Sequence, residues 1–136
     1  IRWSPTLGLN IVGAVNGAGG TLYFSTFGNT NPPGVGGSAD DADIYSWNGT
    51  SYARVIDASA APYSLPANAN VDGYVRTDAT HGYFSFSATT TTVPGLGAVP
   101  DENVLAYNAG TWSVYFDGTA QGLTADNQDV DAFDVP

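Results

Sequence analysis

The sequence contains one unit twice, and this duplication dictates much of the fold. Residues 21–57 align with residues 81–117 at an offset of 60 positions, with a one-residue slip to 61 in the loop where "PGVG" (33–36) meets "PGLG" (94–97). The closing stretches 70–75 and 129–135 align at an offset of 59. The clearest pairs are Phe24 with Phe84, Asp41 with Asp101, Ile44 with Val104, Trp47 with Tyr107, Tyr52 with Trp112, and Asp57 with Asp117. A shared offset over so many aromatic and acidic positions indicates a true repeat, so both copies should adopt the same structure.

Each copy is expected to form four β-strands. The first strand, residues 21–27 in the first copy, is aromatic and β-branched, and a loop rich in glycine and proline follows it. The second and third strands meet at Asn48 and Gly49, the residue pair that most favours a two-residue hairpin turn. The fourth strand is residues 70–75, or residues 129–135 in the second copy. Because no window shows a helical period, the sequence predicts an all-β protein.

The predicted architecture is a β-sandwich or flattened barrel built from two four-stranded repeats, with one extra strand in front of them. Residues 1–20 are interpreted as an N-terminal strand followed by a glycine-rich hinge. Residues 21–136 are interpreted as one all-β domain, with repeats at 21–77 and 81–135. The predicted core comprises Leu22, Phe24, Ile44, Val55, Phe84, Phe86, Val104, Trp112, Val114, Phe116 and Phe133.

The charge balance of the chain argues against several classes of partner. Thirteen acidic residues stand against three basic ones, and the formal net charge is −10. Proteins bind nucleic acids and anionic membranes through lysine and arginine, so neither is expected as a partner. The chain has no cysteine, and therefore neither a disulfide nor a thiolate metal site can form.

Other features favour an exported protein. The chain begins at Ile1 and contains no methionine, as expected of a product from which a leader has been removed. No apolar run approaches the roughly 20 residues that cross a bilayer. We therefore expect a soluble protein with an extracellular or cell-surface location.

The sequence carries no catalytic motif, and we expect the protein not to be an enzyme. His81 is the only histidine, and no Gly-x-Ser-x-Gly motif accompanies it, so a turn or surface role is the preferred interpretation. The adjacent acid pairs Asp40-Asp41 and Asp101-Glu102 are candidates for glycoside hydrolysis. Neighbouring residues of a strand point to opposite faces, however, so neither pair can face one substrate together.

One acidic segment suggests a hard cation. Its oxygen-bearing side chains are Asp126, Asn127, Asp129, Asp131 and Asp134. The equivalent stretch of the first copy retains Asn68, Asn70 and Asp72. Ca²⁺ takes about six to eight oxygen ligands, which acidic loops supply, so Ca²⁺ is a candidate cofactor. The alternative is a set of solvated turns in which these side chains cap their own backbone.

Aromatic residues beside the two hairpins raise the possibility of glycan binding. Trp47, Tyr52, Tyr107 and Trp112 flank the turns, and exposed rings can stack on sugar faces. Strand alternation instead favours a core position for Trp112. Asn48 begins an Asn-x-Thr acceptor sequence for N-glycosylation, although a hairpin turn explains the same residues.

The N-terminal segment carries an apolar row on one side of its predicted strand. The row comprises Leu7, Leu9, Ile11 and Val15. Such a row must be buried against a sheet, and the glycine-rich residues 15–20 would let the segment leave its own domain. We predict that residues 1–16 pair with a neighbouring copy and link the copies head to tail. Pairing within the same chain is the alternative.

Four motifs of the second copy carry a resemblance to known repeats. They are "PGLG" (94–97), "DEN" (101–103), "YFD" (115–117) and "DVDAFDV" (129–135). Together they resemble repeats of uncharacterised secreted bacterial proteins, over residues 21–135, and this resemblance implies export and a repeated β unit. The order of an apolar strand and then a β domain is similar to that in donor-strand-linked pilus subunits.

These observations together predict an extracellular structural protein, the subunit of a pilus-like filament assembled by strand donation. The alternative function is a secreted carbohydrate-binding module, or a surface adhesion module stabilised by calcium.

Overall fold

The structure, a computed structural model of the chain, describes residues 9–11, 20–125 and 127–136. Its regular structure is almost entirely β, so the all-β prediction is confirmed. The helical structure in these residues is one 3-10 turn, η1 (Thr119–Gln121). No helix in this part of the chain is long and apolar enough to cross a membrane.

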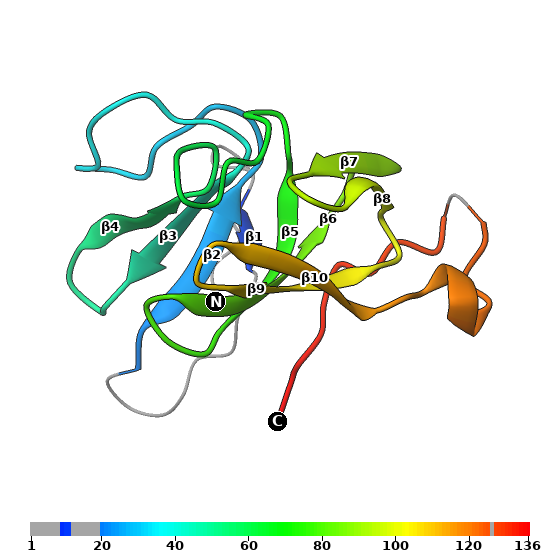
Figure 1. The fold of residues 1–136 in the computed structure, drawn as a ribbon. Coiled ribbons are helices and arrows are strands. Elements are labelled where there is room, and N and C mark those ends of the chain that lie inside the picture. Colours follow the sequence, from blue (N-terminus) through cyan, green and yellow to red (C-terminus); the bar gives the residue numbers. More distant parts are fainter. Residues whose placement is uncertain (1–8, 12–19, 126) are drawn as a thin grey trace.

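The described strands form three antiparallel sheets (Figure 1). The first sheet contains, in this order, β1 (Leu9–Ile11), β2 (Leu22–Thr26), β3 (Asp43–Trp47) and β4 (Tyr52–Asp57). The second sheet has the order β10 (Thr111–Phe116), β9 (Val104–Asn108), β6 (His81–Phe86) and β5 (Val71–Arg76). A separate hairpin consists of β7 (Thr90–Val93) and β8 (Gly97–Pro100).

The two large sheets share one internal order. In the first, β1 pairs with β2, and Leu9 lies opposite Thr26. In the second, β5 pairs with β6, and Val71 lies opposite Phe86. Thr26 and Phe86 are equivalent positions of the repeat, so β1 is the counterpart of β5. The sheets therefore divide the chain before β5, whereas the sequence division assigned residues 70–75 to the end of the first repeat.

The second repeat differs from the prediction in two places. The loop after β6 contains the β7–β8 hairpin, which the sequence pattern did not predict. Its threonine and valine residues favour a strand, and Pro94 and Gly95 supply the turn. Residues 129–135, predicted as a strand, form none. That prediction is wrong because no described strand pairs with this acidic segment, and a strand needs a ladder partner.

One hydrophobic cluster joins all three sheets and the β4–β5 connection. Six of the predicted core residues are buried in the structure, namely Phe24, Ile44, Phe84, Phe86, Val104 and Trp112. Leu22, Phe116 and Phe133 are half-buried. Edge-to-face packing of Tyr23 on Tyr74, with ring centroids 6.1 Å apart, links the first sheet to the second. The aromatic residues of the repeat therefore build a shared core.

Two predicted core residues, Val55 and Val114, are wrong because both are exposed, by 38% and 45%. Val55 lies on the outer face of β4, since its neighbour Arg54 lies on the inner face, where it pairs with the buried Asp43 of β3. In β10, a bulge between Val114 and Phe116 breaks the strict alternation of faces. Both errors come from side-chain orientations that hydrophobicity alone does not determine.

Candidate functional site

β1 forms one edge of the first sheet. It pairs antiparallel with β2, through Leu9 with Thr26, Asn10 with Ser25, and Ile11 with Phe24. The β2 residues Phe24, Ser25 and Thr26 are all buried. Without β1, β2 would present a row of unpaired backbone groups, which is a template for another strand. This edge can thus be completed by the same chain or by a second copy.

The predicted donor row is only partly described by the structure. Leu9 and Ile11 belong to β1, which pairs with β2 of the same chain. Leu7 and Val15 lie outside the described residues. Pairing in a second copy remains a prediction.

A pair of carboxylates lies where β5 meets the C-terminal segment. Asp72 is 6% exposed. Its Oδ1 accepts a hydrogen bond of 2.8 Å from Ser85 Oγ, whereas its Oδ2 has no hydrogen-bond donor among the described residues. The side chain of Asp129 lies within hydrogen-bonding range of Asp72. Burial, and then the negative charge of Asp129, outweigh the Ser85 hydrogen bond and raise the pKa of Asp72 to about 7.

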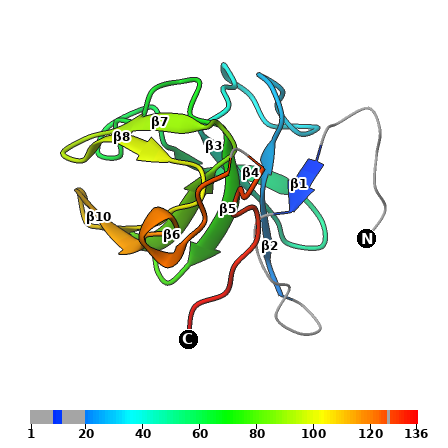
Figure 2. The ribbon, with the colours of Figure 1, turned by 90° about the vertical axis from the view of Figure 1, so that its right-hand side faces the viewer.

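Specific contacts attach the C-terminal segment beside β5 (Figure 2). A Cβ atom on Gly73 would overlap the ring of Phe133, so this ring packs directly on the β5 backbone. The Val130 N–H donates to the Asp101 carbonyl oxygen at 3.4 Å. Asp129 is exposed as a whole residue, but partial desolvation of its carboxylate, and then the charge of Asp101, raise its pKa. The segment therefore brings a second carboxylate to a place that already holds a buried one.

Asp129 is one of the predicted metal ligands, and the structure places it beside Asp72 in this carboxylate pair. Asp126 lies outside the described residues, and Asp129 is exposed, as are Asn127, Asp131 and Asp134. The described residues contain no group of three or more His, Cys, Asp or Glu side chains that could hold a metal ion. Asp72 was predicted only as part of a first-copy site. Its contact with Asp129 depends on the path of the C-terminal segment, which the sequence alone does not reveal.

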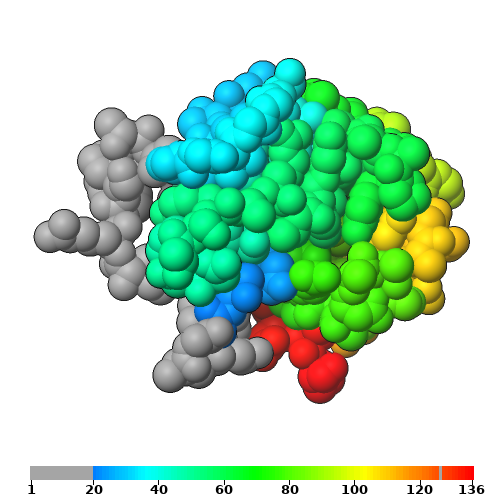
Figure 3. All heavy atoms as spheres, turned by 90° about the vertical axis from the view of Figure 1, so that its left-hand side faces the viewer, coloured from blue at the N-terminus to red at the C-terminus, as the bar shows by residue number. Residues whose placement is uncertain are grey.

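A buried ion pair supports the loop side of the first sheet. Arg54 Nη1 lies 3.4 Å from Asp43 Oδ2, and the Asp43 side chain is completely buried. Tyr45 donates its hydroxyl to the same carboxylate oxygen at 2.9 Å. Arg54 also donates to the Gly36 carbonyl oxygen at 3.1 Å. The ion pair thus connects β3 and β4 to the β2–β3 loop, seen in cyan beside the teal hairpin in Figure 3.

Burial raises the pKa of Asp43, against the opposing effects of the Asp40 N–H, Tyr45 and Arg54. Burial also raises the pKa of Tyr45, and the hydrogen bond to Asp43 adds to this effect. These groups bind one another, so we assign them a structural role.

His81 lies at the start of β6, in a shallow pocket of about 310 Å³. Its Nδ1 is 2.7 Å from Asp78 Oδ2. The hydrogen bond to Asp78 raises the pKa of His81, and no serine or cysteine lines this pocket. The interaction joins two exposed side chains three residues apart in the turn before β6. This placement is the one expected for a turn or surface histidine.

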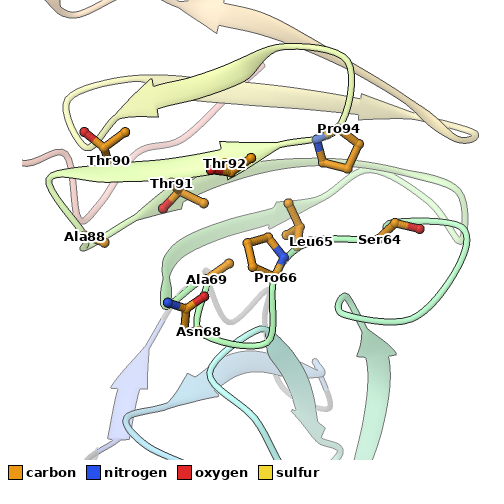
Figure 4. A pocket seen from close by; sticks show the side chains of 10 residues that line it. All are labelled: Ser64, Leu65, Pro66, Asn68, Ala69, Ala88, Thr90, Thr91, Thr92 and Pro94. Carbon is orange, nitrogen blue, oxygen red and sulfur yellow. The ribbon is translucent and has the colours of Figure 1, made fainter.

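A second pocket, of about 490 Å³, lies between β7 and the β4–β5 connection (Figure 4). Its lining residues are Ser64, Leu65, Pro66, Asn68, Ala69, Ala88, Thr90, Thr91, Thr92 and Pro94. All of these side chains are uncharged and most are small. The pocket therefore offers no acid or base for catalysis.

The aromatic residues considered for glycan binding form no exposed row. Tyr107 and Trp112 are buried, and Trp47 and Tyr52 pack on each other with ring centroids 4.5 Å apart. Asn48 is exposed at the hairpin tip, where its Oδ1 accepts hydrogen bonds from the backbone of Thr50 and Ser51. These bonds support the turn interpretation, and N-glycosylation of Asn48 stays a prediction.

Comparison with protein-family models, with curated protein sequences and with solved structures finds no significant match to this chain.

Proposed function

We propose that this chain is the subunit of an extracellular filament in which β1 of one copy completes the first sheet of the next copy. The observation that supports the proposal is the position of β1. It is a three-residue strand at the edge of its sheet. Exchange of an edge strand between identical copies reproduces the same ladder of hydrogen bonds, so the exchange itself loses no backbone pairing.

The sequence next to β1 is compatible with pairing of β1 within its own chain and with pairing of β1 in a second copy. Residues 12–20 include four glycines, and a glycine-rich composition allows a linker to follow more than one path. The donated strand and the β2 edge that receives it are different surfaces of the subunit. Such a contact is heterologous, and when its rotation does not close into a ring it produces a fibre.

A pair of new cysteines tests the exchange, because the chain has no cysteine of its own. Leu9→Cys with Thr26→Cys puts the two thiols at paired positions of β1 and β2. If copies exchange β1, oxidation at high protein concentration links them into a ladder of multimers on a non-reducing gel. If β1 pairs only within its own chain, the oxidised protein stays monomeric at every concentration, and the proposal fails.

Ser46→Cys with Ala53→Cys is the matched control, since these positions pair within the β3–β4 hairpin. This variant should form an intramolecular disulfide at every concentration. Deletion of residues 1–16 should remove any filaments that electron micrographs of the full chain show, and leave a folded protein by circular dichroism. Filaments that persist after the deletion would show that another surface drives assembly.

A further inference from the structure

Equivalent backbone contacts connect each repeat to the segment that leaves it. The Val71 N–H donates to the Asp41 carbonyl oxygen at 3.2 Å, and the Val130 N–H donates to the Asp101 carbonyl oxygen at 3.4 Å. Asp41 and Asp101 are equivalent positions of the repeat. The C-terminal segment is therefore hydrogen-bonded to the second repeat in the same way that the start of β5 is hydrogen-bonded to the first repeat.

Unpartnered oxygen atoms lie at both of these places. At the first, Asp41 Oδ1 and Asn70 Oδ1 are buried and have no donor among the described residues. Asn70, which precedes Val71, is 9% exposed. At the second, Asp72 Oδ2 is also buried without a donor among these residues, and the side chain of Asp129 lies within hydrogen-bonding range of Asp72. Each of these oxygens has lost water without gaining a hydrogen bond, which is unfavourable.

The unpartnered atoms at these two places share one chemistry. All are carboxylate or amide oxygens. Ca²⁺ binds this combination of ligands. Two neighbouring carboxylates repel each other unless a proton or a cation lies between them. In a chain of net charge −10, a divalent cation would relieve that repulsion and partner the buried oxygens.

We infer that the chain binds Ca²⁺ at two sites, one at Asp72 and Asp129 and the other at Asp41 and Asn70. The first of these sites is the tighter one, because it supplies two carboxylates where the other supplies one carboxylate and one amide. Each ion ties the segment that leaves one repeat to its neighbouring strands. The inference does not depend on filament assembly.

Isothermal titration calorimetry of the full chain with CaCl₂, after treatment with a chelator, tests the inference. We expect two bound ions per chain. Asp72→Asn keeps the shape of the side chain and its acceptor for Ser85, and should remove the tighter ion. Asp129→Asn should do the same. Asp134→Asn is the control, because it makes the same charge change at an exposed position of the same segment and should leave both ions bound.

Thermal unfolding gives a second readout. Ca²⁺ should raise the melting temperature of the unaltered chain, because a ligand that binds the folded state stabilises it. Asp72→Asn should lose most of that rise. Asp41→Asn combined with Asn70→Ala should remove only the weaker ion.

Three results would overturn the inference. Absence of both binding heat and a melting shift at millimolar CaCl₂ would mean that the carboxylate pair shares a proton. Unchanged binding in Asp72→Asn would mean that the ligands are elsewhere. Loss of both ions in the Asp41→Asn, Asn70→Ala variant would exclude two separate sites.

Discussion

The two halves of the chain carry different groups at equivalent positions of their hairpins. Arg54 and Asp43 form the buried ion pair of the first half. At the corresponding positions of the second half stand Val114 and Asn103. Val114 is 45% exposed, and Asn103 Oδ1 accepts a hydrogen bond of 2.8 Å from the Gly118 N–H. One half therefore buries a charge with its partner, and the other has no charge at either position.

This difference shows that the repeat specifies its aromatic positions more strictly than its electrostatics. A buried ion pair is strongly destabilised when one partner is removed, although replacing both partners with neutral groups is often tolerated. The second half is a natural example in which neutral residues occupy both positions. It supplies the residues for testing how much the first half depends on its charges.

The largest effect is expected from Arg54→Val, which leaves Asp43 buried without its cation. The free energy of unfolding should fall by about 3–5 kcal/mol. Adding Asp43→Asn gives the first half the residues of the second and should recover most of the loss. Urea unfolding of the single and double variants measures both effects.

Arg76→Val is the charge-matched control for this experiment. Arg76 is exposed and contacts the Tyr23 hydroxyl at 2.7 Å, so its loss should cost at most about 1 kcal/mol. Equal losses for Arg54→Val and Arg76→Val would refute the special role of the buried pair.

A smaller loss is expected where the halves differ in backbone packing. A Cβ atom on Gly118 would overlap the Glu102 carbonyl group, whereas the equivalent Ala58 is completely buried with its methyl group. Gly118→Ala should lower the free energy of unfolding by about 1–3 kcal/mol through overpacking. Ala58→Gly should cost about 1 kcal/mol, through backbone entropy and lost burial. Chemical denaturation compares the two, and a neutral Gly118→Ala would contradict the predicted overlap.

The next comparison concerns a single hydrogen bond. Trp112 donates its indole N–H to the Tyr63 carbonyl oxygen at 3.0 Å, while the equivalent residue of the first half is the half-buried Tyr52. Trp112→Tyr should lower the free energy of unfolding by about 1 kcal/mol. The reciprocal Tyr52→Trp should change it less. Thermal melts of the two variants check this order, and the reverse order would contradict the stabilising role of the Trp112 hydrogen bond.

The smallest effect is expected for His81→Thr, which installs the residue found at the equivalent Thr21. The hydrogen bond to Asp78 raises the pKa of His81 above 6.5. The resulting stabilisation is therefore present below pH 6.5 and is lost as the pH rises through the folded-state pKa. The Thr80 N–H and the His81 ring lower the pKa of Asp78 below 3.8. The stabilisation that comes from the ionised Asp78 is therefore present above pH 3.8 and is lost as the pH falls through its folded-state pKa.

The melting temperatures of the original chain and His81→Thr should therefore differ most near pH 5 and converge above pH 8. An NMR titration of the His81 ring measures the raised pKa directly. A difference that grows with increasing pH would contradict the sign of this interaction.

Much of the fold was predictable because its signals are local. The turn residues Asn48 and Gly49 and the aromatic strands that begin at Leu22 and His81 are local features, and the structure contains strands at each of these places. Residues 129–135 were mispredicted, because their pattern copies that of β5 but a strand also requires a partner. The pairing of Asp72 with Asp129 was missed for a related reason, since it joins segments that are far apart in the chain.

The sequence by itself determined the all-β class and the aromatic core positions shared by the repeats, since strand propensity, turn residues and the repeat offset are properties of neighbouring or equivalent residues. Only the tertiary structure decided that β5 heads the second sheet, that Arg54 rather than Val55 faces inward, and that the C-terminal segment brings Asp129 to Asp72. The physical reason is that sheet partners and the burial of charge depend on which distant groups satisfy one another. Local pattern does not contain that information.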